Sequence, residues 1–340
     1  MAFQEFVIQP LELFEGVIHS AFSDLLPAGE GAYDGVLNEF TLMDNVANKR
    51  PIVDIRKKMK IIQRRDASCD LNYKKIMGTG VRSIEVTDLY GAVQHCKHEF
   101  YQGALRDWEN EDGDMFGSKI LPYFKDAMRT DLAANAWFGD VERVDSASYN
   151  FSTCEFNGVF KWLQTYTTNG LIPASQTIAM PVTNMRTNPS QAYGILLAMY
   201  NAQSPLMRAL PDTSKAFYVS KPVLDGYKMY LRSLGTTIEY LDLFANGVKI
   251  ATYEGIPIIV VPLFEPILVD LNGGALTHNA AILTMRKNFC FATDKDYGEG
   301  EDGKTALMVW YEKRKLSWYY QMFLKGGTQI AEPEMIVYAL

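Results

Sequence analysis

The sequence predicts an α+β fold in which apolar strands from the second half of the chain pack with helices from its middle. Three stretches support this prediction. Residues 256–264 are almost all apolar and β-branched, with Pro257 and Pro262 near the ends, which suits a short strand buried on both faces. Residues 115–139 repeat apolar side chains at every fourth position, the spacing of a long helix. Residues 307–311 and 316–324 have the composition of long strands.

Length and composition describe a chain with ample material for a core. Its 340 residues suggest two domain-sized cores, or one intricate domain with extensions. Hydrophobic residues make up 48% and aromatic residues 12%. Two interpretations stay open: a large core, or apolar surface buried between subunits. The net charge of -7 argues against a dedicated nucleic-acid binder, because phosphate binding requires an excess of Lys and Arg on at least one large face.

The chain carries no signal that directs it to export or into a membrane. The N-terminus lacks a basic segment followed by a long apolar one, so we expect no signal peptide. The apolar stretch at 256–264 is too short to span a bilayer. The cysteines are scattered, so we expect reduced thiols in a cytoplasmic protein. They are Cys69, Cys96, Cys154 and Cys290.

The pattern of residues 1–50 predicts an N-terminal arm that consists of a helix and a loop. After Pro10, apolar residues recur at helical spacing as far as Pro27, and a glycine-rich loop follows. A single helix with so narrow an apolar face cannot form a core of its own. We therefore expect it to dock on the main body or on a neighbouring subunit.

A strongly basic segment follows, between residues 49 and 82, and alternation within it predicts a long polar two-stranded ribbon. It is either a solvated hairpin or an arm that lies across an acidic neighbour. The basic candidates for such a contact are Arg56, Lys57, Lys58, Arg64, Arg65, Lys74 and Lys75. The acidic candidates in the same chain are Asp107, Glu109, Glu111, Asp112 and Asp114. Complementary charge of this kind would favour association and fix the register between packed copies.

The remaining elements follow from local patterns. The long helix should end at Gly139, and Ser220 and Gly235 should cap and stop a later helix. Further helices are predicted at residues 155–166, 190–200 and 223–234, and strands at 216–219, 248–253, 256–262, 280–285, 288–292 and 334–340. Residues 255–294 should supply the central sheet.

No motif predicts an active site. Residues 298–303 match GxGxxG by letter, but they neither open a helix nor carry basic residues, and their carboxylates would repel a pyrophosphate. His95, Cys96 and His98 with Cys69 form only one ligand cluster, whereas a zinc site needs paired ligands from two. The sequence has no nucleophile elbow and no phosphate-binding loop. We therefore expect no catalytic residues, no cofactor and no metal.

Several short sequence segments resemble segments of tailed-bacteriophage major capsid proteins of the Hong Kong 97 type. They are Ala216-Phe-Tyr-Val-Ser, Asn279-Ala-Ala-Ile-Leu-Thr, Asn288-Phe-Cys-Phe-Ala-Thr-Asp294 and Gly327-Thr-Gln-Ile-Ala-Glu-Pro-Glu-Met-Ile-Val. The resemblance covers about residues 50–340. It implies an N-terminal arm at 1–50 and an extended β-hairpin loop at 51–100. A peripheral domain would take 101–180 and 282–340, with a spine helix at 115–139, and an axial α/β domain would take 181–281.

The resemblance also implies a mechanical function. Copies would join as hexamers and pentamers into an icosahedral shell that encloses double-stranded DNA without sequence-specific binding, in a virion assembled in the host cytoplasm. Expected partners are a separate scaffolding protein, a portal and decoration proteins, and no membrane is involved. Two alternatives stay open: an encapsulin-type shell, and a cytoplasmic α/β enzyme whose site is assembled from distant residues.

Overall fold

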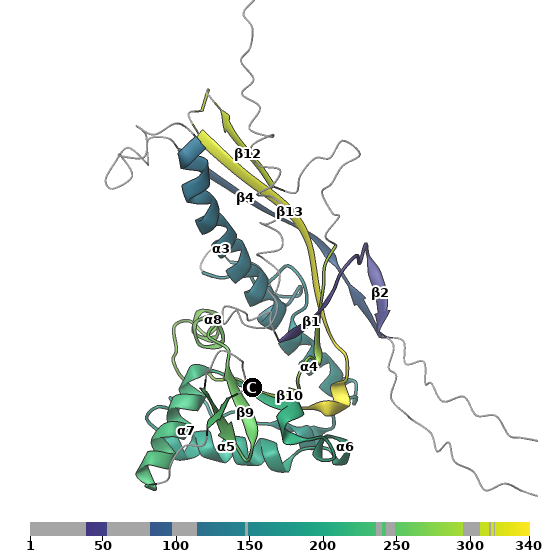
Figure 1. Ribbon diagram of the computed structural model, residues 1–340, viewed down its shortest axis with the longest axis vertical. Helices are drawn as coiled ribbons and strands as arrows, with labels where there is room; N and C mark the ends of the chain where they lie inside the picture. Colours follow the sequence, from purple (N-terminus) through teal and green to yellow (C-terminus); the bar gives the residue numbers. More distant parts are fainter. Residues whose placement is uncertain are drawn as a thin grey trace, which may run out of the picture.

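The computed structural model describes residues 39–52, 82–96, 114–146, 149–235, 240–242, 249–294, 307–312, 314–315 and 317–340. These residues form two large sheets, a two-stranded ribbon and several helices (Figure 1). The predicted mixed α+β architecture is confirmed. The predicted N-terminal helix and most of the basic ribbon lie outside the described residues.

The first sheet has seven strands and forms the lower part of the molecule in Figure 1. In spatial order they are β5 (Thr177–Ile178), β14 (Ile336–Ala339), β10 (Ala281–Met285), β6 (Lys215–Val219), β9 (Ile256–Val260), β8 (Lys249–Tyr253) and β7 (Tyr240–Asp242). β6 pairs with β9 and β14 with β5 in parallel, and the other neighbours are antiparallel.

Helices cover both faces of this sheet. They are α3 (Asp114–Phe138), α4 (Val159–Thr168), α5 (Pro189–Asn201), α6 (Pro205–Arg208), α7 (Lys221–Ser233) and α8 (Phe264–Leu271), with short 3-10 turns at Ala174–Gln176, Asp212–Ser214 and Pro333–Met335. Ala216 and Tyr218 of β6 belong to a core shared with α3, α4 and α8, whereas Phe217 and Val219 belong to a core shared with α5 and α7. Because both of its faces are covered, every residue of β6 is buried.

The second sheet is built on the long strand β13 (Ser317–Ile330). Around it lie β4 (Thr87–Cys96), β12 (Leu307–Glu312), β11 (Phe289–Ala292) and β1 (Phe40–Met43). α3 runs along one face (Figure 1), where Tyr320, Met322 and Leu324 are buried. A Cβ at Gly91 of β4 would lie 2.2 Å from the sulfur of Met128, so this glycine leaves room for the methionine side chain of α3 to pack on the strand.

An aromatic cluster joins the two sheets. Trp137, near the end of α3, is fully buried and meets Phe40 of β1 and Phe289 of β11 with ring centroids 5.0 and 5.2 Å away. The same ring meets Phe264 of α8 at 5.0 Å and Tyr218 of β6 at 6.0 Å. One side chain therefore contacts both sheets and a covering helix.

Some local predictions are confirmed and others are wrong. The predicted helix at 115–139 is α3, and 190–200 and 223–234 correspond to α5 and α7. The helix predicted at 155–166 begins four residues later, because the preceding residues bond to α3: Glu155 N donates to Asn135 Oδ1, and Gly158 N donates to Gly139 O.

The stretch at 255–294 differs most from its prediction. It contains α8, which the sequence pattern missed, and it does not form one central sheet. β9 and β10 lie in the seven-stranded sheet, whereas β11 pairs with β1 and β13 in the other. Ser220 does precede α7, but its side chain contacts Asn279 Oδ1 at 3.3 Å and makes no capping hydrogen bond.

Candidate subunit interface

Most of the predicted interface residues lie outside the described part of the chain. Asp114 is the first residue of α3, while the seven basic candidates of the ribbon and the other acidic candidates lie outside the described residues. Of the ribbon, the structure describes the base from which it leaves the body.

The base is a short antiparallel pair of strands, β2 (Lys49–Ile52) and β3 (Arg82–Glu85). Its opposed residues include Arg50 with Ile84, and Lys49 forms an ion pair with Glu85. A small core anchors it to the body, and its members are Val46, Ile52, Ile84, Cys290 and Ala292. An isolated two-stranded ribbon is marginal in water, so this core supplies the support that the base needs.

Lys325 fixes the connection between this base and β13. Its side chain is almost buried, and its Nζ donates to Ala47 O at 2.7 Å. The same Nζ lies 3.6 Å from Asp88 Oδ1 and 3.9 Å from Asp294 Oδ2. Two carboxylates and a carbonyl thus compensate the buried charge, and the contact ties β4, β13 and the loop before β2 together.

Close backbone packing reinforces the same junction. A Cβ at Gly327 would lie 2.0 Å from Glu85 O, so β3 crosses β13 where only glycine fits. Gln329 Nε2 donates to Ser83 O at 3.2 Å, and Val86 N donates to Asn48 O at 3.0 Å. The ribbon therefore starts from a firmly held base. We call this base, together with the contacts of Lys325, Gly327 and Gln329 that hold it, the root of the ribbon.

The face of β4 and β13 that turns away from α3 is open. Tyr90 of β4 is 73% exposed, and its partner on β13 is Phe323. Gln94 and Tyr319 continue the pairing on this face. β4 is an edge strand among the described strands, and exposed edges with apolar side chains are surfaces that another chain can cover.

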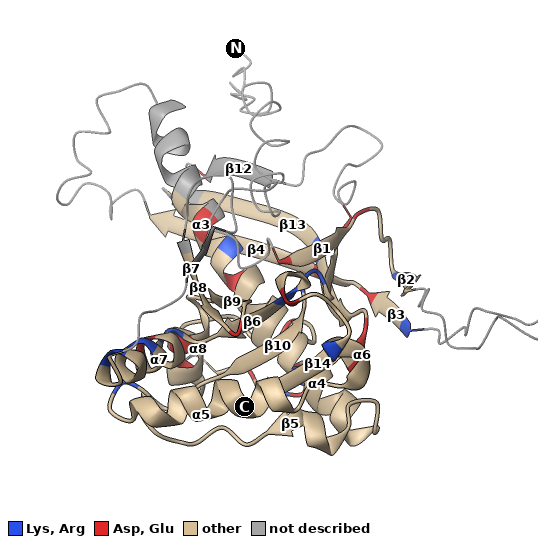
Figure 2. Cartoon of the chain, turned by 60° about the horizontal axis from the view of Figure 1, so that its bottom comes forward, with Lys and Arg blue, Asp and Glu red and all other residues tan. Residues whose placement is uncertain are grey.

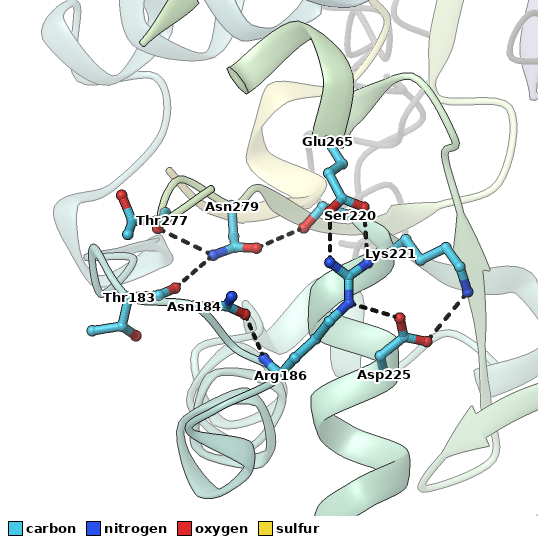
Figure 3. Close-up of polar contacts among 9 residues, drawn as sticks. All are labelled: Thr183, Asn184, Arg186, Ser220, Lys221, Asp225, Glu265, Thr277 and Asn279. Carbon is cyan, nitrogen blue, oxygen red and sulfur yellow. Dashed lines mark hydrogen bonds and ion pairs between the residues drawn. The ribbon is translucent and has the colours of Figure 1, made fainter. Parts of the chain in front are cut away.

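A polar network holds the loop before α5 against two helices. Arg186 Nη1 and Nη2 donate to the two carboxylate oxygens of Glu265 at 2.7 and 3.0 Å, and Nε donates to Asp225 Oδ2 at 3.1 Å (Figure 3). Lys221 Nζ donates to the other oxygen of Asp225 at 3.3 Å. The hydrogen bonds that Arg186 donates to Glu265, with the one that it donates to Asp225, raise the pKa of Arg186. The guanidinium is therefore committed to internal partners.

A surface cavity of about 350 Å³ lies between α4 and α8, and its charged lining residues are paired. Lys161 Nζ lies 2.9 Å from Asp140 Oδ1 and 2.5 Å from Glu142 Oε2, and the hydrogen bonds that it donates to Glu142 and Asp140 raise the pKa of Lys161. Arg143 Nη1 donates to Thr153 Oγ1 at 3.0 Å. These contacts stabilise the loop after α3 and place no nucleophile beside a base among the residues that line the cavity.

Of the candidate metal ligands, the structure describes His95 and Cys96, and these two have different neighbours. His95 packs against Tyr320 with ring centroids 6.4 Å apart, and Ser317 Oγ donates to Cys96 Sγ at 3.7 Å. Cys69 and His98 lie outside the described residues, as does the glycine-rich turn at 298–303. In the part of the chain that the structure describes, no cluster of three or more His, Cys, Asp or Glu could hold a metal ion. None of the described helices has the length and apolar character to cross a bilayer.

Comparison with known proteins gives no match by sequence and extensive matches by structure. No protein-family model and no curated protein sequence matches the chain. A chain of the satellite phage P4 procapsid, solved with the size determination protein, has a TM-score of 0.57 and 10% identity, over 96% of this chain and 89% of that chain.

Two further shells give similar agreement. The capsid of Myoviridae phage XM1 has a TM-score of 0.52 and 12% identity, over 91% of this chain and 92% of that chain. The capsid of an empty GTA particle has a TM-score of 0.50 and 12% identity, over 92% and 91%. The chain therefore has the fold of these phage capsid proteins, and its resemblance to Hong Kong 97-type major capsid proteins is confirmed at the level of the fold.

Proposed function

We propose that this protein is the major capsid protein of a tailed phage and that many copies assemble into an icosahedral shell. One observation carries the proposal: the likeness to phage capsid chains extends over about nine-tenths of both chains. A likeness confined to one domain would leave room for another activity in the remainder. Here only about a tenth or less of either chain lies outside the likeness.

The Hong Kong 97-type parts map onto the chain as follows. Residues 1–50 are the arm, 51–100 the extended loop and 181–281 the axial domain, and 101–180 with 282–340 form the peripheral domain, with α3 as its spine helix. The strands β5 and β14 come from the proposed peripheral segments and join the sheet of the proposed axial domain. The two proposed domains are therefore interlocked, as a subunit that transmits force across a shell requires.

Subunit contacts form through the ribbon in this proposal. Its basic residues lie across the acidic segment that precedes α3 in the next copy, which gives a heterologous contact that closes into rings of six and five. The contacts of Lys325 and Gly327 hold the base of the ribbon, β2 and β3, against the body. A firmly held base suits this role because ring closure depends on the rotation between neighbours.

The enclosed double-stranded DNA is not gripped. With a net charge of -7, the subunit repels the phosphate backbone, so the genome does not adhere to the wall. The protein catalyses no reaction in this proposal, because the polar clusters of the described residues are paired internally and support the fold. A separate scaffolding protein, a portal and decoration proteins complete the virion, which assembles in the host cytoplasm.

Electron microscopy of the purified protein, combined with sedimentation, tests the proposal. We expect closed shells, or hexamers and pentamers that convert into shells. Nucleic acid inside particles purified from infected or producing cells supports a phage capsid, whereas a protein cargo indicates an encapsulin-type compartment. A uniform monomer or small dimer at every salt and protein concentration contradicts the proposal and favours the enzyme alternative.

A further inference from the structure

One segment of the chain is almost free of charge. Between Lys161 and Arg208 the sequence contains a single Asp, Glu, Lys or Arg, namely Arg186, although 21% of the whole chain is charged. Soluble proteins normally place charged residues of both signs over their exposed surface. A charge-free segment of this length would be unremarkable if it were buried, so its exposure decides what it means.

Much of the segment is exposed. After the end of α4, which packs in the core that the sheet shares with α3 and α8, it comprises the edge strand β5, the helix α5 and most of α6, whose buried residues belong to the core on the other side of the sheet. Figure 2 brings this side forward, and α5 and β5 are tan throughout, whereas α7 carries blue and red residues and α8 carries red ones. Val182 is 64% exposed and Leu206 57%, and Leu197 is also exposed. We call the exposed surface of residues 177–207 the uncharged face.

The single charge of the segment does not face outward as a free group. The guanidinium of Arg186 makes its fork of hydrogen bonds to Glu265 and a further one to Asp225, both on neighbouring helices (Figure 3). The only cation of the segment is thus paired with two carboxylates. The folded structure therefore leaves no unpaired charge on the uncharged face.

α5 presents a smooth stripe on this face. Its exposed residues are Ser190, Gly194, Leu197 and Asn201, which follow each other at helical spacing. A Cβ at Gly194 would meet no atom within 4 Å, so the fold does not need glycine there. A small residue in an open position allows another backbone or helix to approach closely.

We propose that the uncharged face is a contact between copies of this chain in the assembled shell, and this inference rests on the proposed function. Each subunit carries a charge of -7, so two copies repel each other wherever their ordinary surfaces meet. A surface without charges removes this repulsion locally and contributes apolar area to the contact. The ribbon then provides complementary charge at one contact, and the uncharged face provides neutrality at another.

The other occupants fit less well. DNA requires Lys and Arg, which the uncharged face lacks. A bilayer surface is bound through a large apolar area with basic residues beside it. Here the exposed apolar residues are interspersed with exposed Thr, Asn and Ser, and no basic residue is exposed among them. Specificity for a different protein usually uses complementary charges. A second copy of the same neutral surface, or of another part of the same subunit, needs none.

A charge introduced into the uncharged face tests the inference. Leu197→Glu should reduce the yield of closed shells about tenfold or more, because a carboxylate would be buried without a partner in every copy. Leu197→Gln, which is polar but neutral, should assemble at close to the wild-type yield. Met229→Glu on α7 is the matched control, because Met229 is 48% exposed among Lys221, Asp225 and Arg232. Circular dichroism and thermal unfolding of the unassembled subunits check that all variants fold.

Thiol labelling supplies a second readout that does not depend on blocking assembly. Leu197→Cys and Met229→Cys are labelled with a maleimide in shells and in dissociated subunits, and each site is quantified by peptide mass spectrometry. In shells we expect labelling at 197 to slow about tenfold or more, with little change at 229. Equal labelling at 197 in shells and free subunits overturns the inference, as does protection that appears only in particles containing a second protein.

The two proposals fail in different ways. If the wild-type protein forms no shell, the proposed function fails and this inference fails with it. If wild-type and Leu197→Glu proteins assemble equally well, the inference alone is overturned and the capsid function stands.

Discussion

The indole of Trp137 and the phenyl ring of Phe264 meet edge to face, with ring centroids 5.0 Å apart and planes at 82°. Trp137 lies near the end of α3 and Phe264 begins α8, and both are fully buried. Edge-to-face aromatic pairs add stability beyond the area that they bury. This contact is part of the cluster that holds the two sheets in one body.

Truncation of Trp137 should therefore weaken the whole subunit. We expect Trp137→Ala to lower the free energy of unfolding by about 3–5 kcal/mol, because it leaves a large cavity where two sheets meet. Denaturant unfolding of the unassembled subunit measures the effect. Tyr123→Ala, at an exposed position on the same helix, is the control and should change it by about 0.5 kcal/mol or less. Equal midpoints for the two variants would contradict the role of the cluster.

Replacement of Lys325 should loosen the root of the ribbon. Lys325→Met keeps the length of the side chain but removes the hydrogen bond to Ala47 O, and we expect a loss of about 1–3 kcal/mol. Hydrogen exchange should accelerate at the amide of Val46, which donates to Thr293 O, and at that of Val86. Lys315→Met, at an exposed lysine, should leave both amides protected. Unchanged protection in Lys325→Met would show that the root is held without this lysine.

Buried tyrosines should make the subunit unfold at alkaline pH. Burial raises the pKa of Tyr166 and of Tyr320 to about 12, and burial raises that of Tyr218 as well. In the unfolded chain the pKa of a tyrosine is about 10. The unfolded state therefore loses these protons first, so their contribution to stability is complete below about pH 10 and is lost as the pH rises towards 12.

Absorbance of tyrosinate and circular dichroism, followed together against pH, measure this effect. We expect the signal of the buried tyrosinates to appear together with the loss of structure. Tyr320→Phe cannot ionise at this position, and the Tyr320 hydroxyl has no hydrogen-bond partner among the described residues, so the alkaline transition of this variant should move to higher pH. A complete tyrosinate signal from a protein that keeps its native spectrum would refute the prediction.

Charge reversal in the ribbon tests the proposed contact between its basic residues and the acidic segment before α3. The double variant Arg64→Glu with Arg65→Glu should fold but assemble poorly, because like charges would meet across the contact. Adding Glu109→Lys and Glu111→Lys should restore assembly by exchanging the two signs. Lys228→Glu with Arg232→Glu makes the same change in net charge on α7 and should assemble normally. Normal shells from the ribbon variant would remove the ribbon from the interface.

Local periodicity predicts those elements whose burial lies on one face. Phe124, Leu132 and Ala136 are buried on one side of α3, and their four-residue spacing predicts that helix to within one residue at each end. β6 and β10 are predicted equally well, because strands buried on both faces have continuous apolar runs.

Predictions fail where distant residues decide the outcome. The apolar run from Ile256 predicts a strand as far as residue 264, whereas α8 begins at that residue. The sequence pattern does not predict this helix, because a proline such as Pro266 usually interrupts a helix. Pro266 lies in the first turn of α8, where its missing N–H costs no helical hydrogen bond. β13 was expected to end at Leu324, yet it continues through Gly326 and Gly327, because β3 crosses the strand there.

In the candidate interface, too, local patterns are predictable from the sequence and contacts between distant residues are not. The charges of the ribbon are evident in the sequence, because they cluster within one segment. The residues that hold its root are not, because Lys325 lies in an otherwise ordinary strand and its partners come from three distant segments. A single lysine followed by two glycines within an apolar strand is the only local signal.

The position of β14 has a consequence for the timing of synthesis. Among the described strands it is the last along the chain, yet it lies inside the seven-stranded sheet between β10 and β5. On the ribosome, β10 must wait with one edge unpaired until residues 336–339 emerge. The sheet is therefore completed only after these residues have left the ribosome, and a chain truncated before them lacks the strand that joins β5 to β10.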